Sequence, residues 1–442
     1  MDGRTETLRV RGKRMKISII NGCLITADKN GTRLRGRVYV DGEKIVYAGA
    51  DEGAPEFAAE RVIDADGGII APGFIDAHTH VPMTLFRGYA DDMPLMDWLQ
   101  NKIWPAEEKL TEEAVYWGTM LAIAELVSGG VTCFSDMYNF CGAIAKAAEE
   151  SGIRALIASA VIDIDGNGDK RLRDAEELYE SLKGNGRVRA AVGPHAEYTV
   201  SPEMFIKVRD LAQRLGMRVH VHVSETQGEH EQCLKRHGKT PIALMESLGL
   251  LDVPVMAAHC VYVEDADIEI MAKKGVSALS CPGSNLKLGS GVAPVAKMLE
   301  KGVNVCCATD GAASNNNLSM AEEMTLLALL QKGVNRNPSL VPADTAFRTA
   351  TINGAKALGI DGITGSLEAG KQADIIIINA KGFRYCPKTD LLNHLVYSGS
   401  DSDVTLTMTG GKILYENGQI TFADPEEIKS KAEEFSSKIT GC

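Results

Sequence analysis

The sequence predicts an α/β protein built on a (β/α)8 TIM-type barrel, with a small β-sandwich-like domain assembled from both ends of the chain. Three observations predict this architecture. Apolar, strand-like runs alternate with helix-like runs through the middle of the chain, eight such units can be counted, and short β-like segments flank them on both sides. Alternation of this kind indicates a parallel sheet, and eight units fit a barrel better than an open sheet.

The first β-like region runs from Lys16 to about Val62. Its segments KISIINGCLITA and GRVYVDGEKIVYAGA contain Asn-Gly and Asp-Gly pairs, which are typical of tight hairpin turns. A matching pattern returns near the C-terminus in ADIIIINA and VTLTMTGGKILYENGQI. We therefore expect residues 16–68 and 370–442 to form one composite β domain, preceded by a basic tail over residues 1–15.

The barrel is expected over residues 69–369. Its strand candidates, in chain order, are IIAPGFIDAHTH, GVTCFSDM, RALIASAVID, RAAVGPHAEY, RVHVHVSE, PVMAAHC, VSALSCP and VNVCCATDG. Helix-like stretches lie between them. One of these is TEEAVYWGTMLAIAELVSGG, and its closing Gly-Gly pair is typical of a helix end.

Composition limits the partners and the compartment. With 45% hydrophobic and 24% charged residues, the chain has the balance of an ordinary soluble protein. A net charge of −12 argues against a nucleic-acid or anionic-membrane partner. The ten cysteines form no CxxC pair, which favours reduced thiols and a cytoplasmic location. No segment approaches the roughly 20 apolar residues that a membrane span needs, and the basic N-terminus lacks a signal-peptide core.

Side chains that carry chemistry in such a barrel project from the C-terminal ends of its strands. His78 and His80 end the first predicted strand, and because residues i and i+2 of a strand share a face, their imidazoles would lie together. A His-x-His pair can also arise by chance. Here, however, most of the nine histidines lie at predicted strand ends. The strand-end residues beyond the first strand are His195, His220, His222, Glu225, His259 and Asp310.

Such a set at one mouth of a barrel predicts a metal site. Three histidines and an aspartate suit a divalent ion such as zinc. An open coordination position would hold a water molecule, whose pKa falls to roughly 7 on zinc, so that hydroxide becomes available at neutral pH.

Longer stretches resemble a known family. The segments PGFIDAHTHVPMTLFRGYADDMPLMDWLQNKIWPAEEKL, GPHAEYTVS, HVSET, AAHC, SNLKLGSGVAPV, TDGAASNNNLSMAEEM and GSLEAGKQADIIIIN resemble the amidohydrolase superfamily. Within it, they are most similar to the S-adenosylhomocysteine, methylthioadenosine and 5′-deoxyadenosine deaminases, from about Lys16 to about Gln419. Those enzymes bind one divalent metal ion and replace the 6-amino group of adenine with oxygen. The resemblance therefore implies a deaminase with one Zn2+ per subunit and a small nucleoside substrate. We also expect a homo-oligomer, a dimer or a tetramer.

The resemblance also implies a role for each residue that matches the family's motifs. The implied metal ligands are His78, His80, His222 and Asp310. Glu107 matches the residue that binds the ribose hydroxyls, and His195 matches a second substrate-binding residue. Glu225 matches the acid that protonates a ring nitrogen of the bound substrate. His259 matches the histidine beside the attacking hydroxide, and Asp310, also at the substrate, takes the proton of that hydroxide.

Several of these residues have a simpler structural interpretation. Glu225 could be a surface carboxylate on a loop, and His259 could be a hydrogen-bonded core histidine. Glu107 lies in an EEK run that could be the solvated face of a helix. Trp98 and Trp104 could form a lid over the pocket, or they could be ordinary core aromatics.

Three positions depart from the family's pattern, and a fourth, Arg171, could match it. His220 shares a strand face with His222 and is interpreted as an inner barrel side chain. Ser280 stands where many relatives carry a histidine. Ser159 is aligned with a third-strand arginine that holds the carboxylate of S-adenosylhomocysteine in relatives that accept it. Arg171 could retain a second such contact, or it could be a solvated helix residue. We therefore expect compact, uncharged 5′ groups to be preferred.

Other functions of this fold would predict different residues at particular positions of the sequence. Guanine deaminases of this fold carry an arginine–phenylalanine pair after the fourth strand, where this chain has GPHAEY. Some triazine chlorohydrolases lack a carboxylate at the position of Glu225. A non-catalytic scaffold with the same barrel would be expected to lose metal ligands, and all four are present. The H-x-E and P-C-x-x-C motifs of the other zinc deaminase architecture are absent.

Overall fold

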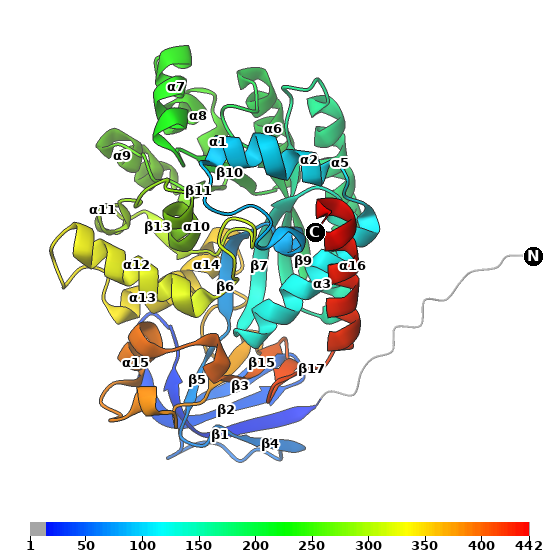
Figure 1. The fold of residues 1–442 in the computed structure, drawn as a ribbon. Coiled ribbons are helices and arrows are strands. Elements are labelled where there is room, and N and C mark those ends of the chain that lie inside the picture. Colours follow the sequence, from blue (N-terminus) through cyan, green and yellow to red (C-terminus); the bar gives the residue numbers. More distant parts are fainter. Residues whose placement is uncertain (1–14, 442) are drawn as a thin grey trace, which may run out of the picture.

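The computed structural model describes residues 15–441, so the expected basic tail over residues 1–15 lies almost wholly outside the described residues. The predicted fold class is confirmed. An eight-stranded parallel sheet forms a nearly closed barrel with helices around it, and both ends of the chain contribute to a separate sheet, which lies below the barrel in Figure 1.

The strands of the barrel pair in chain order, each parallel to the next. They are β6 (Phe74–Thr79), β7 (Val131–Tyr138), β8 (Arg154–Val161), β9 (Val188–Pro194), β10 (Val219–Val223), β11 (Val255–His259), β12 (Ser277–Ser280) and β13 (Asn304–Cys307). Beyond the last strand, the amide of Asp310 donates to the carbonyl of His78 at 2.9 Å. The amide of Thr309 donates to the carboxylate of Asp76 at 3.0 Å. These bonds join the two ends of the sheet at the mouth where the site was predicted.

Helices cover the outside of the barrel. The main ones are α3 (Glu112–Ser128), α4 (Cys141–Ser151), α5 (Gly168–Leu182), α6 (Pro202–Leu215), α7 (Gln227–His237), α8 (Pro241–Ser247), α9 (Asp265–Lys274), α10 (Pro282–Lys287), α11 (Val295–Glu300), α12 (Met320–Val334), α13 (Ala343–Thr349) and α14 (Ile352–Leu358). Their ends follow local signals. Thr111 caps α3 by accepting a hydrogen bond from the amide of Ala114 at 3.2 Å, and the helix stops at Gly129, as the Gly-Gly pair predicts.

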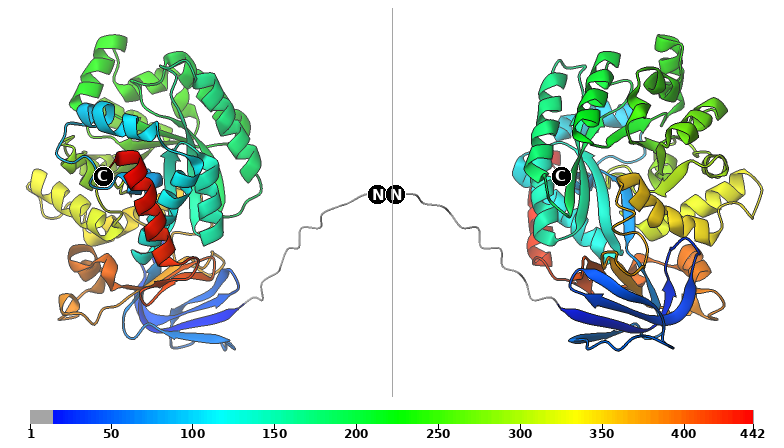
Figure 2. Two further views of the ribbon diagram at one scale, coloured as in Figure 1. Left: turned by 45° about the vertical axis from the view of Figure 1, so that its right-hand side comes forward. Right: turned by 180° about the vertical axis from the view of Figure 1, so that it is seen from behind.

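The second sheet has nine strands. They are β1 (Lys16–Ile25), β2 (Arg33–Asp41), β3 (Lys44–Ala50), β4 (Arg61–Asp64), β5 (Ile69–Pro72), β14 (Ile375–Ile378), β15 (Val404–Thr409), β16 (Lys412–Glu416) and β17 (Gln419–Ile420). The order is β17-β16-β15-β14-β5-β1-β2-β3, with β4 against β1, so the antiparallel β5–β14 pair joins the two ends of the chain. After this sheet, α16 (Pro425–Thr440) runs back along α3 (Figure 2).

The first barrel strand is shorter than predicted. Residues 69–80 were expected to form one strand, but Ile69–Pro72 is β5 of the second sheet, and β6 starts at Phe74. Gly73 lies between them, and a Cβ atom there would lie 2.2 Å from Thr132 Oγ1. The backbone passes so close to its neighbour that only glycine fits. A continuous apolar run does not reveal such a change of sheet, because both halves are buried.

Three short helical segments lie across the mouth of the barrel. They are α1 (Leu95–Trp98), the π-helix η2 (Leu99–Ile103) and α2 (Trp104–Glu107), drawn in blue above the strands in Figure 1. Within the described part of the chain, no helix has both the length and the apolar character needed to cross a membrane.

A buried ion pair fastens the barrel to the second sheet. Arg154, at the start of β8, donates from Nε and Nη2 to the two carboxylate oxygens of Asp374 at 2.6 and 3.1 Å. The two side chains are 4% and 0% exposed, so neither charge is solvated. The amide of Gly410 donates to the same carboxylate at 2.6 Å. In this bidentate pair, each buried charge is compensated by the other. Removal of either partner would therefore leave an uncompensated charge in the interior.

We expect Arg154→Ala to lower the free energy of unfolding by about 3–5 kcal/mol, because Asp374 would be left as a buried, unpaired carboxylate. Urea unfolding followed by circular dichroism would measure this loss. The matched control is Arg187→Ala, which removes an exposed pair with Glu43 at 3.0 Å and should cost no more than about 1 kcal/mol. Equal losses in the two variants would contradict the structural role of the buried pair.

Candidate active site and metal centre

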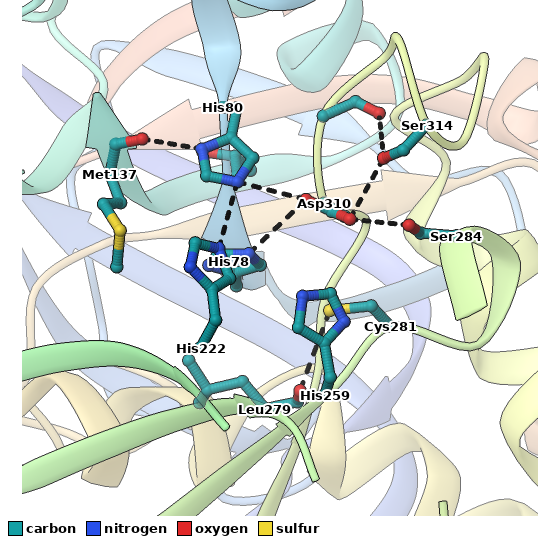
Figure 3. A network of polar contacts seen from close by, with 12 residues as sticks. His78, His80, Met137, His222, His259, Leu279, Cys281, Ser284, Asp310 and Ser314 are labelled. Atoms are coloured by element: carbon teal, nitrogen blue, oxygen red, sulfur yellow. Dashed lines mark hydrogen bonds and ion pairs between the residues drawn. The ribbon is translucent and has the colours of Figure 1, made fainter. Parts of the chain in front are cut away.

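The structure brings the predicted metal ligands together at the C-terminal mouth of the barrel (Figure 3). His78 lies in β6 and His80 directly follows that strand, whereas His222 lies in β10 and Asp310 follows β13. Nε2 of His78 and Nε2 of His80 each lie 3.4 Å from Oδ1 of Asp310. Nε2 of His222 lies 3.3 Å from Nε2 of His80. Four donor atoms from three separate strands therefore face one small volume.

The chemistry of these donors fits a bound cation. His78 Nε2 is wholly buried, and it makes no hydrogen bond within the part of the chain that the structure describes. A buried polar atom without a partner typically costs about 1–3 kcal/mol. Nitrogen donors with one carboxylate oxygen are the ligands that zinc prefers. A divalent ion would satisfy all of these groups at once.

Hydrogen bonds orient the histidines for this purpose. Nδ1 of His80 lies 2.6 Å from the carbonyl oxygen of Met137, and Nδ1 of His222 lies 2.8 Å from the carbonyl oxygen of His195. Because a carbonyl only accepts, Nδ1 carries the proton in both rings, and Nε2 presents its lone pair to the site. Burial lowers the pKa of His78 to about 4 and holds the pKa of His222 well below its usual range. Burial thus favours the neutral forms of His78 and His222, which ligation requires.

Asp310 is held by one oxygen so that the other faces the histidines. Its Oδ2 accepts hydrogen bonds from the hydroxyls of Ser284 at 2.6 Å and Ser314 at 3.0 Å. Burial alone would raise the pKa of Asp310, but the contact with His78 and the neighbouring imidazoles hold it well below its usual range. The backbone of Asp310 has a φ of +65°, a strained conformation for this residue.

A second pair of titratable groups lies beside these donors. Nε2 of His259 is 3.7 Å from Oε2 of Glu225, whose other oxygen accepts from the hydroxyl of Ser290 at 3.3 Å. Nδ1 of His259 lies 2.9 Å from Oδ1 of Asn285, which fixes the ring. Burial raises the pKa of Glu225. Burial alone would lower the pKa of His259, but the carboxylates of Glu225 and Asp310 raise it. Both shifts favour the protonated form of the group concerned.

The loop that carries Glu225 is held by a residue that the sequence analysis missed. Both oxygens of buried Glu229 accept backbone hydrogen bonds, from the amides of Ser224 at 2.9 Å and Glu225 at 2.8 Å. Ser224 has a φ of +49°, so the loop turns sharply here. Thr226 caps α7 by accepting from the amide of Glu229. The T-x-x-E spacing of a capping box could have revealed this contact, although here the carboxylate reaches past the cap.

A pocket of about 750 Å3 opens onto these groups and includes the predicted substrate residues. Glu107 points into it and accepts a hydrogen bond from the hydroxyl of Tyr138 at 2.6 Å, and burial raises the pKa of Glu107. His195 also lines it. Trp98 and Trp104, on the segment across the mouth, both line the pocket. The apolar part of the wall includes Met83, Leu95, Trp98, Leu99, Ile103, Trp104, Met137, Ala160, Ile162 and Leu288.

On β8, residues other than Ser159 line the pocket. Ser159 does not line the pocket; it interacts with Cys141 of α4 on the outer side of the strand. Ala160 and Ile162 face the pocket instead. Arg171 lies outside the pocket lining and binds the carboxylate of Asp165 with Nη1 and Nη2 at 2.7 and 2.8 Å. No lysine or arginine lines the pocket among the residues that the structure describes.

The segment after β12, and not Ser280 at the end of that strand, contributes side chains to the site. Ser280 lines a separate small cavity between the barrel and its helices, and it does not line the site pocket. The short helix α10 that follows supplies Ser284 and Asn285, which orient Asp310 and His259. No local pattern in the sequence indicates these two contacts, because each joins separate strand ends.

Comparison with known proteins gives concordant matches. A model of the amidohydrolase family matches residues 69–414. A 5-methylthioadenosine/S-adenosylhomocysteine deaminase of Moorella thermoacetica is 43% identical over 413 residues, which are 93% of this chain and 96% of that protein. Among solved structures, an adenosine deaminase from Xanthomonas campestris with bound zinc has a TM-score of 0.94 at 35% identity, covering 96% of this chain and 99% of that one.

A more distant enzyme shares the same fold. A variant of the atrazine chlorohydrolase from Arthrobacter aurescens, solved with zinc and atraton, has a TM-score of 0.89 at 25% identity and covers 95% of this chain and 100% of that one. The matches to these three proteins span nearly the whole of each chain, so they include both the barrel and the second sheet.

We expect Glu229→Ala to speed hydrogen exchange at the amides of Ser224 and Glu225 by at least about tenfold, because each amide would lose an acceptor worth about 1.5–3 kcal/mol. Mass spectrometry of peptides that span residues 222–229 would measure the rates. The control is Glu231→Ala, an exposed substitution on the same helix, which should leave those rates unchanged. Unchanged rates in both variants would rule out this anchoring role.

Proposed function

The chain belongs to the amidohydrolase family, and from that premise we propose that it is a metal-dependent hydrolytic deaminase of adenine nucleosides. The overall reaction adds water at C6 of the purine and releases ammonia, which leaves the inosine-type product. The observation that carries the proposal is the buried Glu225–His259 pair, 3.7 Å apart, in the same pocket as the metal donors. The 43% identity to a deaminase, against 25% to a chlorohydrolase, supports a nucleoside substrate.

We assign the metal ion to His78, His80, His222 and Asp310, as one divalent cation per subunit, Zn2+. When bound, such an ion supplies Lewis acidity and lowers the pKa of water that it coordinates to roughly 7. The protein's own contribution is to bring the Nε2 atoms of three imidazoles to one point beside Asp310. The hydroxyls of Ser284 and Ser314 hold Oδ2 of Asp310, so that Oδ1 faces the site, where the carboxylate would accept the proton of the attacking water.

The second pair of groups acts on the purine ring. Attack at C6 drives negative charge onto the ring, so a carboxylic acid directed at the adjacent nitrogen N1 stabilises the product of attack. Glu225 has the raised pKa that keeps a proton available for this step. His259, oriented by Asn285, would hydrogen-bond to the attacking oxygen. The proton taken up by Asp310 then passes to the departing amino group, the bond between C6 and that nitrogen breaks as ammonia leaves, and the second proton of the water returns to Glu225.

The remaining pocket would hold the nucleoside sugar. One oxygen of Glu107 accepts from Tyr138, which leaves the other oxygen to accept hydrogen bonds from the two ribose hydroxyls. His195 lies beside the same space. Trp98 and Trp104 cover it and would exclude water from the reacting atoms. A bound nucleoside would thus be held at both ends, by Glu107 at the sugar and by Glu225 at the base.

We expect Glu225→Gln to retain the metal ion but to lose about 10²–10⁴-fold in kcat, because its proton is needed only in the transition state. His222→Ala should lose both metal and activity. Elemental analysis of the purified proteins and an ammonia-release assay would measure the two quantities. A Glu225→Gln variant within threefold of the wild-type kcat would assign the proton to another group. Full metal occupancy in His222→Ala would refute the ligand assignment.

The 5′ side of the pocket predicts which nucleosides are preferred. Ala160 and Ile162 line the pocket and offer no side-chain donor, and no lysine or arginine among the described residues lines it, so a charged tail would find no counter-ion. We therefore expect kcat/KM for 5′-deoxyadenosine and 5′-methylthioadenosine to exceed that for S-adenosylhomocysteine. Measurement of all three in one buffer would test this. A tenfold lead for S-adenosylhomocysteine, about 1.4 kcal/mol in transition-state stabilisation, would show that a charged group reaches the tail after all.

A further inference from the structure

His220 lies in the interior of the barrel, directly behind the metal donors. It belongs to β10, and its Nε2 lies 2.7 Å from Nδ1 of His78. On its other side, Nδ1 of His220 lies 3.3 Å from the hydroxyl of Ser135 on β7. All three side chains are 0% exposed, so water cannot substitute for any of these contacts. A hydrogen-bonded chain therefore crosses the barrel from β7 through β10 to β6.

This arrangement differs from that of the neighbouring histidines. Nδ1 of His80 and Nδ1 of His222 face carbonyl oxygens, which can only accept a hydrogen bond. The carbonyl partner alone therefore places the proton of each ring on Nδ1. The partner of His78 is a ring nitrogen, which donates or accepts according to its tautomer. The orientation of His78 thus depends on where the proton of His220 lies.

We propose that His220 is a positioning residue that holds His78 in its Nδ1–H tautomer and so aims the Nε2 lone pair at the metal position. The inference rests on the metal site of the proposed function. The assignment of protons follows from geometry. A lone pair at Nε2 of His78 places the proton of that ring on Nδ1, so Nε2 of His220 must accept. The proton of His220 then lies on its own Nδ1 and is donated to Ser135.

Among the residues that the structure describes, His220 is the hydrogen-bond partner of Nδ1 of His78. The inner layer of the barrel around His220 is apolar, with Ile75, Ala77, Met137, Met256 and Ala258 among its buried members. If His220 were apolar, the Nδ1–H of His78 would be buried without an acceptor. The ring could relieve this cost by moving its proton to Nε2, which would occupy the atom needed for the metal. A neutral imidazole also orients His78 without adding a negative charge to the interior.

The test is the affinity of the metal-free protein for Zn2+, measured by competition with a chromogenic chelator. We expect His220→Leu to raise the dissociation constant about 10–100-fold, the usual effect of removing a group that orients a ligand. His220→Gln, whose amide oxygen can accept from Nδ1 of His78, should recover most of that loss. The matched control is Met256→Leu, which alters the strand position paired with His220 without touching His78.

The thermal midpoint of each metal-free protein separates positioning from folding. A purely structural role would lower the midpoint of both His220 variants without separating their zinc affinities. Equal affinities for the leucine and glutamine variants, or a leucine variant within threefold of wild type, would overturn the inference. If His220→Leu does not fold, the zinc affinity of His220→Gln is compared with that of the wild-type protein instead. A loss of affinity above tenfold in His220→Gln would overturn the inference, because a hydrogen-bond acceptor at this position would then not be enough to orient His78.

Zinc binding is measured without substrate, so the inference and the proposed reaction can fail separately. A protein that binds zinc in the predicted way but releases no ammonia from nucleosides would refute only the reaction. A wild-type protein that binds no zinc would refute the inference together with the metal assignment.

Discussion

The seam between the first and last barrel strands is the constraint on which the site depends. His78 and Asp310 lie far apart in the sequence, and their donor atoms lie 3.4 Å apart because the backbone of one is hydrogen-bonded to the backbone of the other at 2.9 Å. Thr309 reinforces this junction by donating to buried Asp76. The hydrogen bonds that close the barrel thus also place the carboxylate of Asp310. For this reason, Asp310 can reach His78 and His80 only when the barrel has closed.

Polar groups behind the site are nearly all paired, and this pairing gives it a defined geometry before any ligand binds. Buried Glu323 on α12 accepts from the amide of Gly283 at 3.0 Å and from the side chain of Asn315 at 2.8 Å, which links the loops that follow β12 and β13. Glu229 does the same for the loop that follows β10. Preorganised donors and acceptors of this kind need no rearrangement during reaction, and this is how enzymes obtain much of their electrostatic stabilisation.

The two sides of the pocket wall differ in their chemistry. Its metal side is made of hydrogen-bonded histidines and carboxylates, whereas its outer side is apolar and is closed by the segment that carries Trp98 and Trp104. An apolar outer wall binds by excluding water and discriminates weakly between neutral groups of similar size. It discriminates strongly against a charge that finds no partner.

The sequence alone determined the alternation that makes a barrel, the pairing of His78 with His80 and the position of each predicted ligand at a strand end, because these depend on the period of a single strand. It did not determine that β5 leaves the barrel at Gly73, that Ser159 faces away from the pocket, or that Ser284 and Asn285 orient the site. Nor did it show that His220 is bonded to His78. Each of these depends on which residues of separate segments come within about 3 Å of one another, and hydrogen bonds of that reach are set only when the strands have paired and the barrel has closed.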